Sequence, residues 1–518
     1  SRSAEAIDAF RRAIELQPGM ADAHAGLGHA LRDLDRKTEA LAVFRHALEL
    51  DPDNVMARWS MTMAQLPVVY GYGEDPGVFR RQFAADLVEL ERWFTPRRMA
   101  KGAVGVGTDQ PFELAYQEEN NRELLARYGA LCSRLMAHWR EEEKVPAPAI
   151  RSGLRQPLRV GVVSAHLRSH SVWSAITKGW FESLDPERFA FHAFHIASEA
   201  DAQTAWARAR SAHFDRGPKE LRHWVNAIQA QQPDVLIYPE VGMDPMTVRL
   251  ASQRLAPVQV ATWGHPETTG LPTIDYYLSG EGLEPQDARA NYTEELVLLP
   301  RLGCHFGPVD LAPSYPDPTQ AGIDPAVPLF VCPGVPFKYA PQFDWVFPEI
   351  ARRLGKCRFI FFSHATHTLS ERLARRLQAV FEAHKLDYNR HVAFIPWQKP
   401  AGFLGWLRRA DVYLDTIGFS GFNTALYAVE SSLPIVAREG RFLRGRLGSG
   451  ILKRLGLAEL VAPTEQGYVD LAVKLARDSE YRQSVARRMD SARDRLYHDT
   501  GAMRAMEDFL SRVAADVG

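Results

Sequence analysis

Within the first 52 residues of the chain, one segment recurs at a spacing of 34 residues. This repeat constrains the fold more than any other feature. The segment EAIDAFRRAIELQP at 5–18 realigns with EALAVFRHALELDP at 39–52. The stretch between them, ADAHAGLGHALRDL, supplies a second helix whose small residues allow neighbouring helices to approach closely. One such hairpin cannot bury its apolar face alone and has to stack on a neighbour. The N-terminal part is therefore predicted to be a stack of helical hairpins.

A period of 34 residues with a proline closing the second helix is the signature of tetratricopeptide repeats. We assign residues 1–66 to such repeats, because one further helix is expected at 54–65 and the pattern then stops. Residues 67–150 are predicted to form a helical connector, with helices at 76–95 and 109–143. So short an array is as consistent with a structural brace as with a peptide-binding groove.

The stretch VPAPAIRSGLRQP at 145–157 contains three prolines and a glycine and is predicted to be a linker. After it, short apolar runs alternate with amphipathic helices, which is typical of parallel α/β lobes. We expect one Rossmann-like lobe over 155–325 and a second over 326–518, with a final helix around 500–515 packed back across the lobes. The expected strands are 158–164, 189–196, 234–240 and 258–264 in the first lobe, and 328–334, 357–363, 391–397, 411–416 and 433–437 in the second.

Composition excludes several classes of protein. The net charge is -1, with 62 basic and 63 acidic residues, so we expect no nucleic-acid partner and no attraction to anionic membranes. No apolar run approaches the length of a membrane span. The four cysteines contain no C-x-x-C pair, which disfavours a disulfide framework or a cysteine zinc site and indicates a reducing cytoplasm. The chain starts inside a repeat, so targeting signals cannot be judged from its first residues.

Ligands of open α/β sheets bind beyond the carboxyl ends of the strands, so the residues that follow each strand are the informative ones. After 411–416, the segment from Gly418 to Thr424 is a turn opening a helix with polar residues at its cap, which suits a diphosphate. Lys338 follows the first strand of the same lobe and could neutralise a phosphate leaving group. Arg444 and Arg446 are weaker candidates, since a basic loop is more often merely exposed.

In the first lobe, the loop SAHLRSHSV follows the opening strand and carries His166 and His170. We expect His170 to face the cleft between the lobes as a base or proton shuttle. The turn WGHPETTG at 263–270, placed after the last strand of this lobe, could close around a sugar or an acceptor. No metal site is expected, because the H-E-x-x-H pattern is absent and no D-x-D occurs in this half of the chain. The absence of G-x-G-x-x-G after a strand argues against a dinucleotide oxidoreductase.

The order of these motifs resembles glycosyltransferase family 41, which contains protein O-GlcNAc transferases, plant protein O-fucosyltransferases and bacterial adhesin N-glucosyltransferases. The resemblance covers essentially the whole chain. It implies an α/β two-lobed B-type glycosyltransferase of two Rossmann-like lobes, preceded by an all-α tetratricopeptide repeat region. It also implies metal-independent, inverting transfer of a sugar from a nucleotide diphosphate to Ser, Thr or Asn of a protein. The implied partners are a nucleotide-sugar donor, expected to be a UDP-sugar, and a protein or peptide acceptor; no other cofactor and no metal are implied.

The resemblance assigns catalytic roles to His170 and to Lys338, which matches the family's diphosphate-binding lysine. The residues implied to bind the nucleotide sugar are Gly421, Phe422, Asn423, Thr424, Tyr427, Glu430, Arg446, Gly264, His265 and Pro266. Some of these depart from the family pattern. Phe422 and Asn423 replace the first two members of a His-Thr-Thr helix start, and Tyr427 stands where O-GlcNAc transferases carry a ribose-binding aspartate. Glu430, one turn further, could substitute for that aspartate.

The main hypothesis is therefore transfer of GlcNAc or glucose from UDP to a protein side chain. The alternatives are a tetratricopeptide adaptor whose lobes have lost catalysis, and a GDP-fucose-dependent protein O-fucosyltransferase. A transferase acting on lipids or small glycans is disfavoured by the repeats, which suit peptide partners. The sugar, the base, the acceptor, O- or N-linkage and the oligomeric state stay open at this point.

Overall fold

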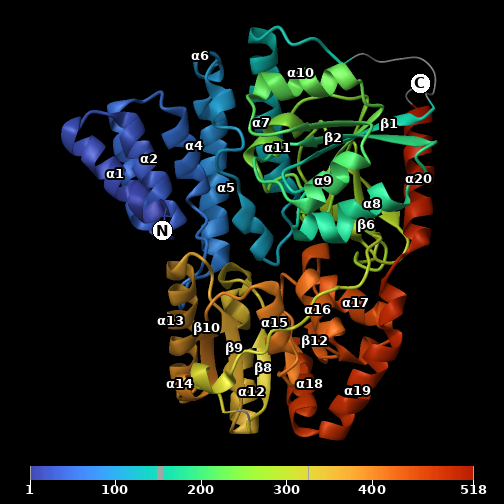
Figure 1. Ribbon diagram of the computed structural model, residues 1–518. Helices are drawn as coiled ribbons and strands as arrows, with labels where there is room; N and C mark the ends of the chain where they lie inside the picture. Colours follow the sequence, from blue (N-terminus) through green and yellow to red (C-terminus); the bar gives the residue numbers. More distant parts are fainter. Residues whose placement is uncertain (1, 149–155, 325, 517–518) are drawn as a thin grey trace.

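The computed structural model describes residues 2–148, 156–324 and 326–516, and it shows a helical N-terminal region beside two α/β lobes (Figure 1). Residues 149–155, the centre of the expected linker, lie outside the described residues, as do the expected boundaries at 150 and 155. None of the described helices is both long and apolar enough to cross a membrane.

The predicted hairpin repeat is present as four antiparallel helices. They are α1 (Arg2–Leu16), α2 (Ala21–Asp33), α3 (Lys37–Leu50) and α4 (Val55–Met63). The small residues of α2 explain the close packing: a Cβ added at Gly26 would lie 2.4 Å from the Phe10 ring, and one at Gly28 would lie 2.5 Å from the Phe44 ring. Each glycine therefore receives an aromatic side chain from the neighbouring helix.

The helical connector is less regular than its sequence predicts. It contains α5 (Pro76–Trp93), α6 (Pro96–Met99), short 3₁₀-helices at Gly102–Val104 and Phe112–Tyr116, and α7 (Arg122–Glu142). The single helix expected at 109–143 is wrong in its first part. Pro111 has no N–H to donate, and the buried Asn121 side chain donates to Leu114 O at 3.0 Å, so residues 109–121 form an ordered turn and α7 starts after it.

The N-terminal lobe is built on a seven-stranded parallel sheet of order β3-β2-β1-β4-β5-β6-β7. The strands are β1 (Leu158–Ser164), β2 (Phe189–His195), β3 (His213–Arg216), β4 (Val235–Tyr238), β5 (Val258–Thr262), β6 (Tyr276–Gly280) and β7 (Glu295–Leu299). The helices are α8 (Lys178–Ser183), preceded by a π-helical turn at Trp173–Thr177, then α9 (Ala202–Ala209), α10 (Leu221–Gln231), α11 (Pro245–Ala251) and a 3₁₀-helix at Ala288–Asn291.

Three of these strands, β3, β6 and β7, were not predicted, and the turn at 263–270 does not follow the last strand of the lobe. It connects β5 to β6, with β7 beyond. The strands β3 and β7 lie at the two edges of the sheet and are partly exposed, so they lack the continuous apolar run that marks a fully buried parallel strand. The short β6 ends in Ser279 and Gly280 and is preceded by turn residues.

The C-terminal lobe has a six-stranded parallel sheet of order β10-β9-β8-β11-β12-β13. The strands are β8 (Leu329–Cys332), β9 (Arg358–Phe362), β10 (Val392–Ile395), β11 (Val412–Leu414), β12 (Ile435–Arg438) and β13 (Val461–Ala462). Its α-helices are α12 (Val346–Leu354), α13 (His367–Ala383), α14 (Tyr388–His391), α15 (Pro400–Leu407), α16 (Asn423–Glu430), α17 (Leu447–Leu455), α18 (Glu465–Arg477), α19 (Ser479–Ala492) and α20 (Thr500–Ala515).

The final helix crosses between the lobes, as predicted from the sequence. Figure 1 shows α20, in red, running along the N-terminal lobe although it belongs to the end of the chain. Its Glu507 accepts from Arg188 at 2.7 Å and from the Asp185 backbone N–H at 3.0 Å, and Phe509 packs edge-on against Tyr276.

The connector is bound to both lobes through buried polar contacts. Asn121 donates to Glu267 of the N-terminal lobe at 2.8 Å, and Glu118 pairs with Arg438 of the C-terminal lobe at 2.5 Å. The buried Arg444 joins all three parts, because its guanidinium contacts Glu267 and donates to Gln117 O at 2.9 Å. The turn at 109–121 therefore packs against the junction of the two lobes.

Candidate functional site

A cleft of about 720 Å³, including space open to solvent, lies between the carboxyl ends of the two sheets. Residues from both lobes and from the connector line it. The sequence-predicted site residues among them are Gly264, His265, Pro266, Lys338, Phe422 and Asn423, and Phe112, Tyr116, Ser171, Val172, Phe419 and Ser420 are also part of the lining. The structure thus brings together half of the predicted set.

Lys338 is the cation of this cleft. It ends a short 3₁₀-helix (Pro336–Lys338) directly after β8, and its Nζ lies 4.4 Å from the centroid of the Phe419 ring. In the part of the chain that the structure describes, no carboxylate lies within ion-pairing distance of Nζ. Burial lowers the pKa of Lys338 to about 8, which the more distant Asp415 partly offsets. A desolvated ammonium without a counter-ion is a site for an anion.

The loop after β11 is organised by Asp415, whose role the sequence reasoning missed. Its Oδ1 accepts from the backbone N–H groups of Thr416 and Gly421, each at 3.0 Å. Its Oδ2 accepts from Ser420 Oγ at 2.6 Å. Ser420 Oγ in turn accepts from the Gly448 N–H at 2.6 Å, which ties the start of α17 to the same loop. An acid directly after a buried strand was the available signal.

The start of α16 differs from the expected polar cap. Phe422 occupies the N-cap position and no side chain caps the helix. The predicted cap residues have other partners: Ser420 bonds Asp415, and Thr424 Oγ1 accepts from Tyr413 O–H at 2.8 Å. The first N–H groups of α16 therefore receive no side-chain oxygen, although Asn423 at the same end lines the cleft. Gly421 supports the turn, because its N–H is held by Asp415.

The histidine loop, residues 164–170, lies on the opposite side of the cleft. The His166 and His170 rings stack with centroids 3.8 Å apart. Burial, together with Arg168, lowers the pKa of His170 to about 4, and that of His166 falls to about 3. Both imidazoles are therefore neutral at physiological pH.

His170 itself does not line the cleft, but the two residues that follow it, Ser171 and Val172, do. Its Nδ1 accepts from the Val172 N–H at 3.2 Å, which leaves the proton on Nε2. Such an imidazole can donate a hydrogen bond from Nε2 to a ligand. Within residues 2–148, 156–324 and 326–516, no group of three or more His, Cys, Asp or Glu side chains is arranged to hold a metal ion.

The turn at Gly264–Pro266 completes this side of the cleft. The Gly264 N–H donates to Pro239 O at 3.0 Å, and a Cβ at this position would lie only 2.4 Å from that oxygen, so the close approach requires glycine. His265 is enclosed: its ring stacks on Phe112 at 4.5 Å, and burial with the charge of Arg444 lowers its pKa to about 3.

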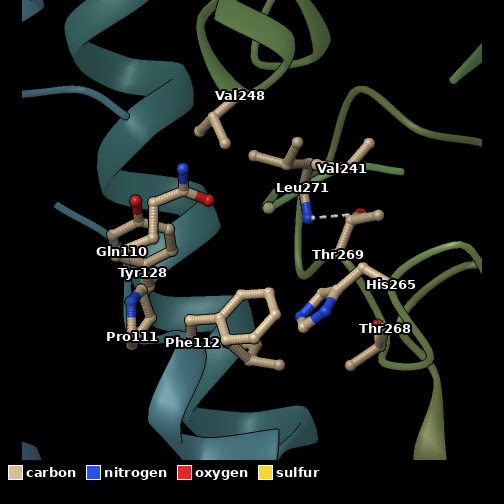
Figure 2. Close-up of a pocket in the computed structure, with 12 residues that line it drawn as sticks. Gln110, Pro111, Phe112, Tyr128, Val241, Val248, His265, Thr268, Thr269 and Leu271 are labelled. Carbon is tan, nitrogen blue, oxygen red and sulfur yellow. Dashed lines mark hydrogen bonds between the residues drawn. The ribbon is translucent and has the colours of Figure 1, made fainter. Parts of the chain in front are cut away.

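His265 and Phe112 also line a second, smaller hollow of about 400 Å³ between the connector and the N-terminal lobe. Figure 2 shows the two rings side by side at one end of this hollow, with Val248 at the other. Sequence reasoning treated residues 67–150 as a helical connector and did not place Phe112 or Tyr116 in the site. The ring of Tyr116 packs on Phe337 and Phe419, 4.9 and 5.0 Å away, directly beside Lys338.

The remaining predicted residues lie outside the lining. Arg446 donates to Leu283 O and Gly440 O, each at 3.1 Å, and so holds the junction between the lobes. Tyr427 packs edge-on against Phe403. Glu430 accepts from Tyr497 O–H and from the Val309 N–H, so it joins α16 to later segments instead of facing the cleft. Thr424 supports the helix start through Tyr413.

Comparison with known proteins gives the same architecture. Residues 401–499 match the family model described as glycosyl transferase family 41, and residues 2–66 match a tetratricopeptide repeat model. A solved structure of an O-GlcNAc transferase variant from Thermobaculum terrenum superposes with a TM-score of 0.71 at 22% identity, covering 100% of this chain and 99% of that one. This likeness confirms the predicted B-type fold of two lobes behind a helical repeat region.

The chain matches only part of the length of its curated relatives. The chain is 26% identical over 340 residues to "Probable UDP-N-acetylglucosamine--peptide N-acetylglucosaminyltransferase SPINDLY" of Arabidopsis thaliana, which covers 62% of this chain and 35% of that protein. It is 26% identical over 337 residues to "UDP-glucose:protein N-beta-glucosyltransferase" of Actinobacillus pleuropneumoniae serotype 5b, covering 64% and 52%. The chain thus spans about a third to a half of these relatives. Residues 2–66 are thus similar to tetratricopeptide repeats, and residues 401–499 are similar to glycosyltransferase family 41.

Proposed function

We propose that this protein transfers a sugar from a uridine diphosphate sugar, UDP-GlcNAc or UDP-glucose, to a side chain of a protein or peptide acceptor, without a metal ion. The observation that carries the proposal is Lys338: a desolvated cation without a carboxylate partner, in the cleft between two B-type lobes. The names of the SPINDLY and Actinobacillus relatives support a UDP-sugar donor and a protein acceptor.

Each lobe contributes residues to a different part of the reaction. An acceptor oxygen or nitrogen attacks the anomeric carbon as the bond from that carbon to the diphosphate breaks, which inverts the configuration. The acceptor proton passes to the departing diphosphate, directly or through water. Lys338 and the N–H groups at the start of α16 stabilise the negative charge that develops on the departing diphosphate. His170 lies next to the cleft-lining Ser171 and, neutral and protonated on Nε2, orients the acceptor on the other side.

The location that we propose is the cytoplasm. All four cysteines are free and buried in the structure, which agrees with a reducing compartment. Separation of cytoplasmic and extracellular fractions, followed by detection of the protein, tests this part of the proposal.

The test of the activity is calorimetric titration of the full chain with UDP and with GDP, both in EDTA. Binding of UDP in EDTA is the expected result, followed by release of UDP from UDP-GlcNAc or UDP-glucose in the presence of acceptor. Preference for GDP would replace the proposal with fucosyl transfer. Binding of neither nucleotide would leave a tetratricopeptide adaptor, and a requirement for added metal would remove the metal-independent part.

A further inference from the structure

Glu240 is a buried acid that the reaction described above does not use. It follows β4 by two residues, at the point of the N-terminal sheet where the strand order reverses between β1 and β4. Such reversal points are where open α/β sheets bind ligands. Its side chain is completely buried, and aspartates or glutamates are rarely enclosed in this way without a specific partner.

The carboxyl group of Glu240 holds the histidine loop. Its Oε1 accepts from Ser164 Oγ at 2.7 Å and from the Ala165 N–H at 2.8 Å. Ser164 Oγ then accepts from the His166 N–H at 2.9 Å. These three bonds fix the backbone where β1 passes into the loop that carries the stacked histidines.

The backbone beside Glu240 supports the turn at Gly264–Pro266. The Gly264 N–H donates to the carbonyl of the preceding Pro239, and a Cβ at Gly264 would lie 3.1 Å from Glu240 Cβ. Thr247 Oγ1 also contacts the Glu240 carbonyl, at 3.4 Å. Glu240 therefore lies between the histidine loop and the Gly264–Pro266 turn, the two segments that form the acceptor side of the cleft.

We propose that Glu240 is a positioning residue that holds the histidine loop and the Gly264–Pro266 turn in one arrangement, so that His170 and the turn meet the acceptor together. This inference rests on the proposed function, because it assigns a task within the same site. Misplacement of an orienting group by a fraction of an ångström is costly in a transfer reaction, whereas binding of the diphosphate in the other lobe does not depend on it.

The protonation of Glu240 fits this task. Burial raises its pKa to about 8, with a smaller contribution from Asp244, so the group is a neutral acid at pH 7. Its Oε2 has no hydrogen-bond partner among the described residues. Only Oε1 carries the two contacts, and an amide oxygen can accept the same two bonds. The role therefore needs the length of the side chain and one acceptor oxygen, and no charge.

Three substitutions separate this role from a purely structural one. Glu240→Ala removes the acceptor oxygen, Glu240→Asp shortens the arm by one methylene, and Glu240→Gln keeps Oε1 in place. The matched control is Gln259→Ala, since Gln259 is equally buried in the same lobe and its loss removes hydrogen bonds to Leu255, Gln253 and Thr273. Thermal unfolding of each variant shows whether the fold is kept.

The readouts are calorimetric binding of UDP and the rate of UDP release from whichever of UDP-GlcNAc and UDP-glucose the native protein turns over. We expect Glu240→Ala and Glu240→Asp to lower the rate by about tenfold or more while the affinity for UDP stays unchanged. Glu240→Gln should restore the native rate. Native rates in Glu240→Ala, an equal loss in Glu240→Gln, or a parallel loss of UDP affinity would each overturn the inference.

Hydrogen exchange measured by mass spectrometry keeps the inference testable even if the native protein binds no nucleotide. Glu240→Ala should speed exchange in both 164–170 and 263–270, and Gln259→Ala should not produce this joint effect. Faster exchange in only one of the two segments would overturn the inference. Failure of the native protein to bind UDP would count against the proposed function alone.

Discussion

Both lobes have a buried acid after the corresponding strand of the sheet, and the two acids differ in charge and in the residues that they hold. In each sheet the strand next to the first one, β4 or β11, is followed by a buried acid: Glu240 in the N-terminal lobe and Asp415 in the C-terminal lobe. Each carboxyl accepts hydrogen bonds from a serine hydroxyl and from the backbone of a loop that borders the cleft, with one N–H group for Glu240 and two for Asp415.

The difference lies in charge and in reach. Asp415 has both oxygens engaged and bonds residues one, five and six positions ahead of it, and burial raises its pKa only to about 6, so it is ionised at pH 7. Glu240 has one oxygen engaged and bonds residues 76 and 75 positions behind it, with a pKa raised to about 8. On the diphosphate side, the charged Asp415 thus holds a loop that is close to it in the sequence. On the acceptor side, the neutral Glu240 holds a loop that is distant in the sequence.

The strongest test of this contrast is Lys338→Ala. Among the described residues that line the cleft, Lys338 carries the positive charge of the diphosphate side, so its loss should lower turnover by about 10²- to 10³-fold. The measurement is UDP release from the donor, with thermal unfolding as the check on folding. Near-native turnover of a folded variant would mean that the diphosphate side does not depend on a positive charge, and would contradict the proposed function.

The next largest effect is expected when the two buried acids, Asp415 and Glu240, are replaced by their amides. Asp415→Asn removes the charge and replaces the oxygen that accepts from Ser420 by an amino group, so we expect UDP to bind roughly tenfold more weakly. Glu240→Gln should leave UDP binding as it is, since its second oxygen has no partner to lose. Calorimetry on both variants makes the comparison directly. Equal losses would show that the two acids do the same work.

This contrast also explains what the sequence could and could not reveal. The repeat, both lobes and the cleft residues Lys338 and Asn423 follow from local patterns of strand, turn and helix start. Asp415 was visible in DVYLDT, but its importance depends on a loop that folds back onto it. Glu240 accepts a hydrogen bond from a loop 75 residues earlier, and Phe112 lines the cleft although it belongs to the connector. Local spacing carries no information on such contacts.

The pH dependence of donor binding follows from Lys338. Its pKa is lowered to about 8 by burial, so it is charged below that pH and neutral above it. A diphosphate binds the charged form, and UDP affinity should therefore fall by about tenfold between pH 7 and pH 9. Titration calorimetry across this range measures it. Lys338→Arg should remove the dependence, because a guanidinium stays charged throughout. A native affinity that rises with pH would contradict the assignment.

The smallest effect is expected at Glu430, where the sequence and the structure disagree. The sequence interpretation lets this residue replace a ribose-binding aspartate, whereas the structure engages it with Tyr497, Val309 and, at 3.8 Å, Arg493. Glu430→Gln keeps an oxygen for Tyr497 and should leave UDP affinity unchanged, with a loss of stability of about 1 kcal/mol from the weakened contacts. Calorimetry and thermal unfolding measure the two quantities. A clear loss of UDP affinity with unchanged stability would restore the ribose role, and would mean that the diphosphate side contains a second functional acid besides Asp415.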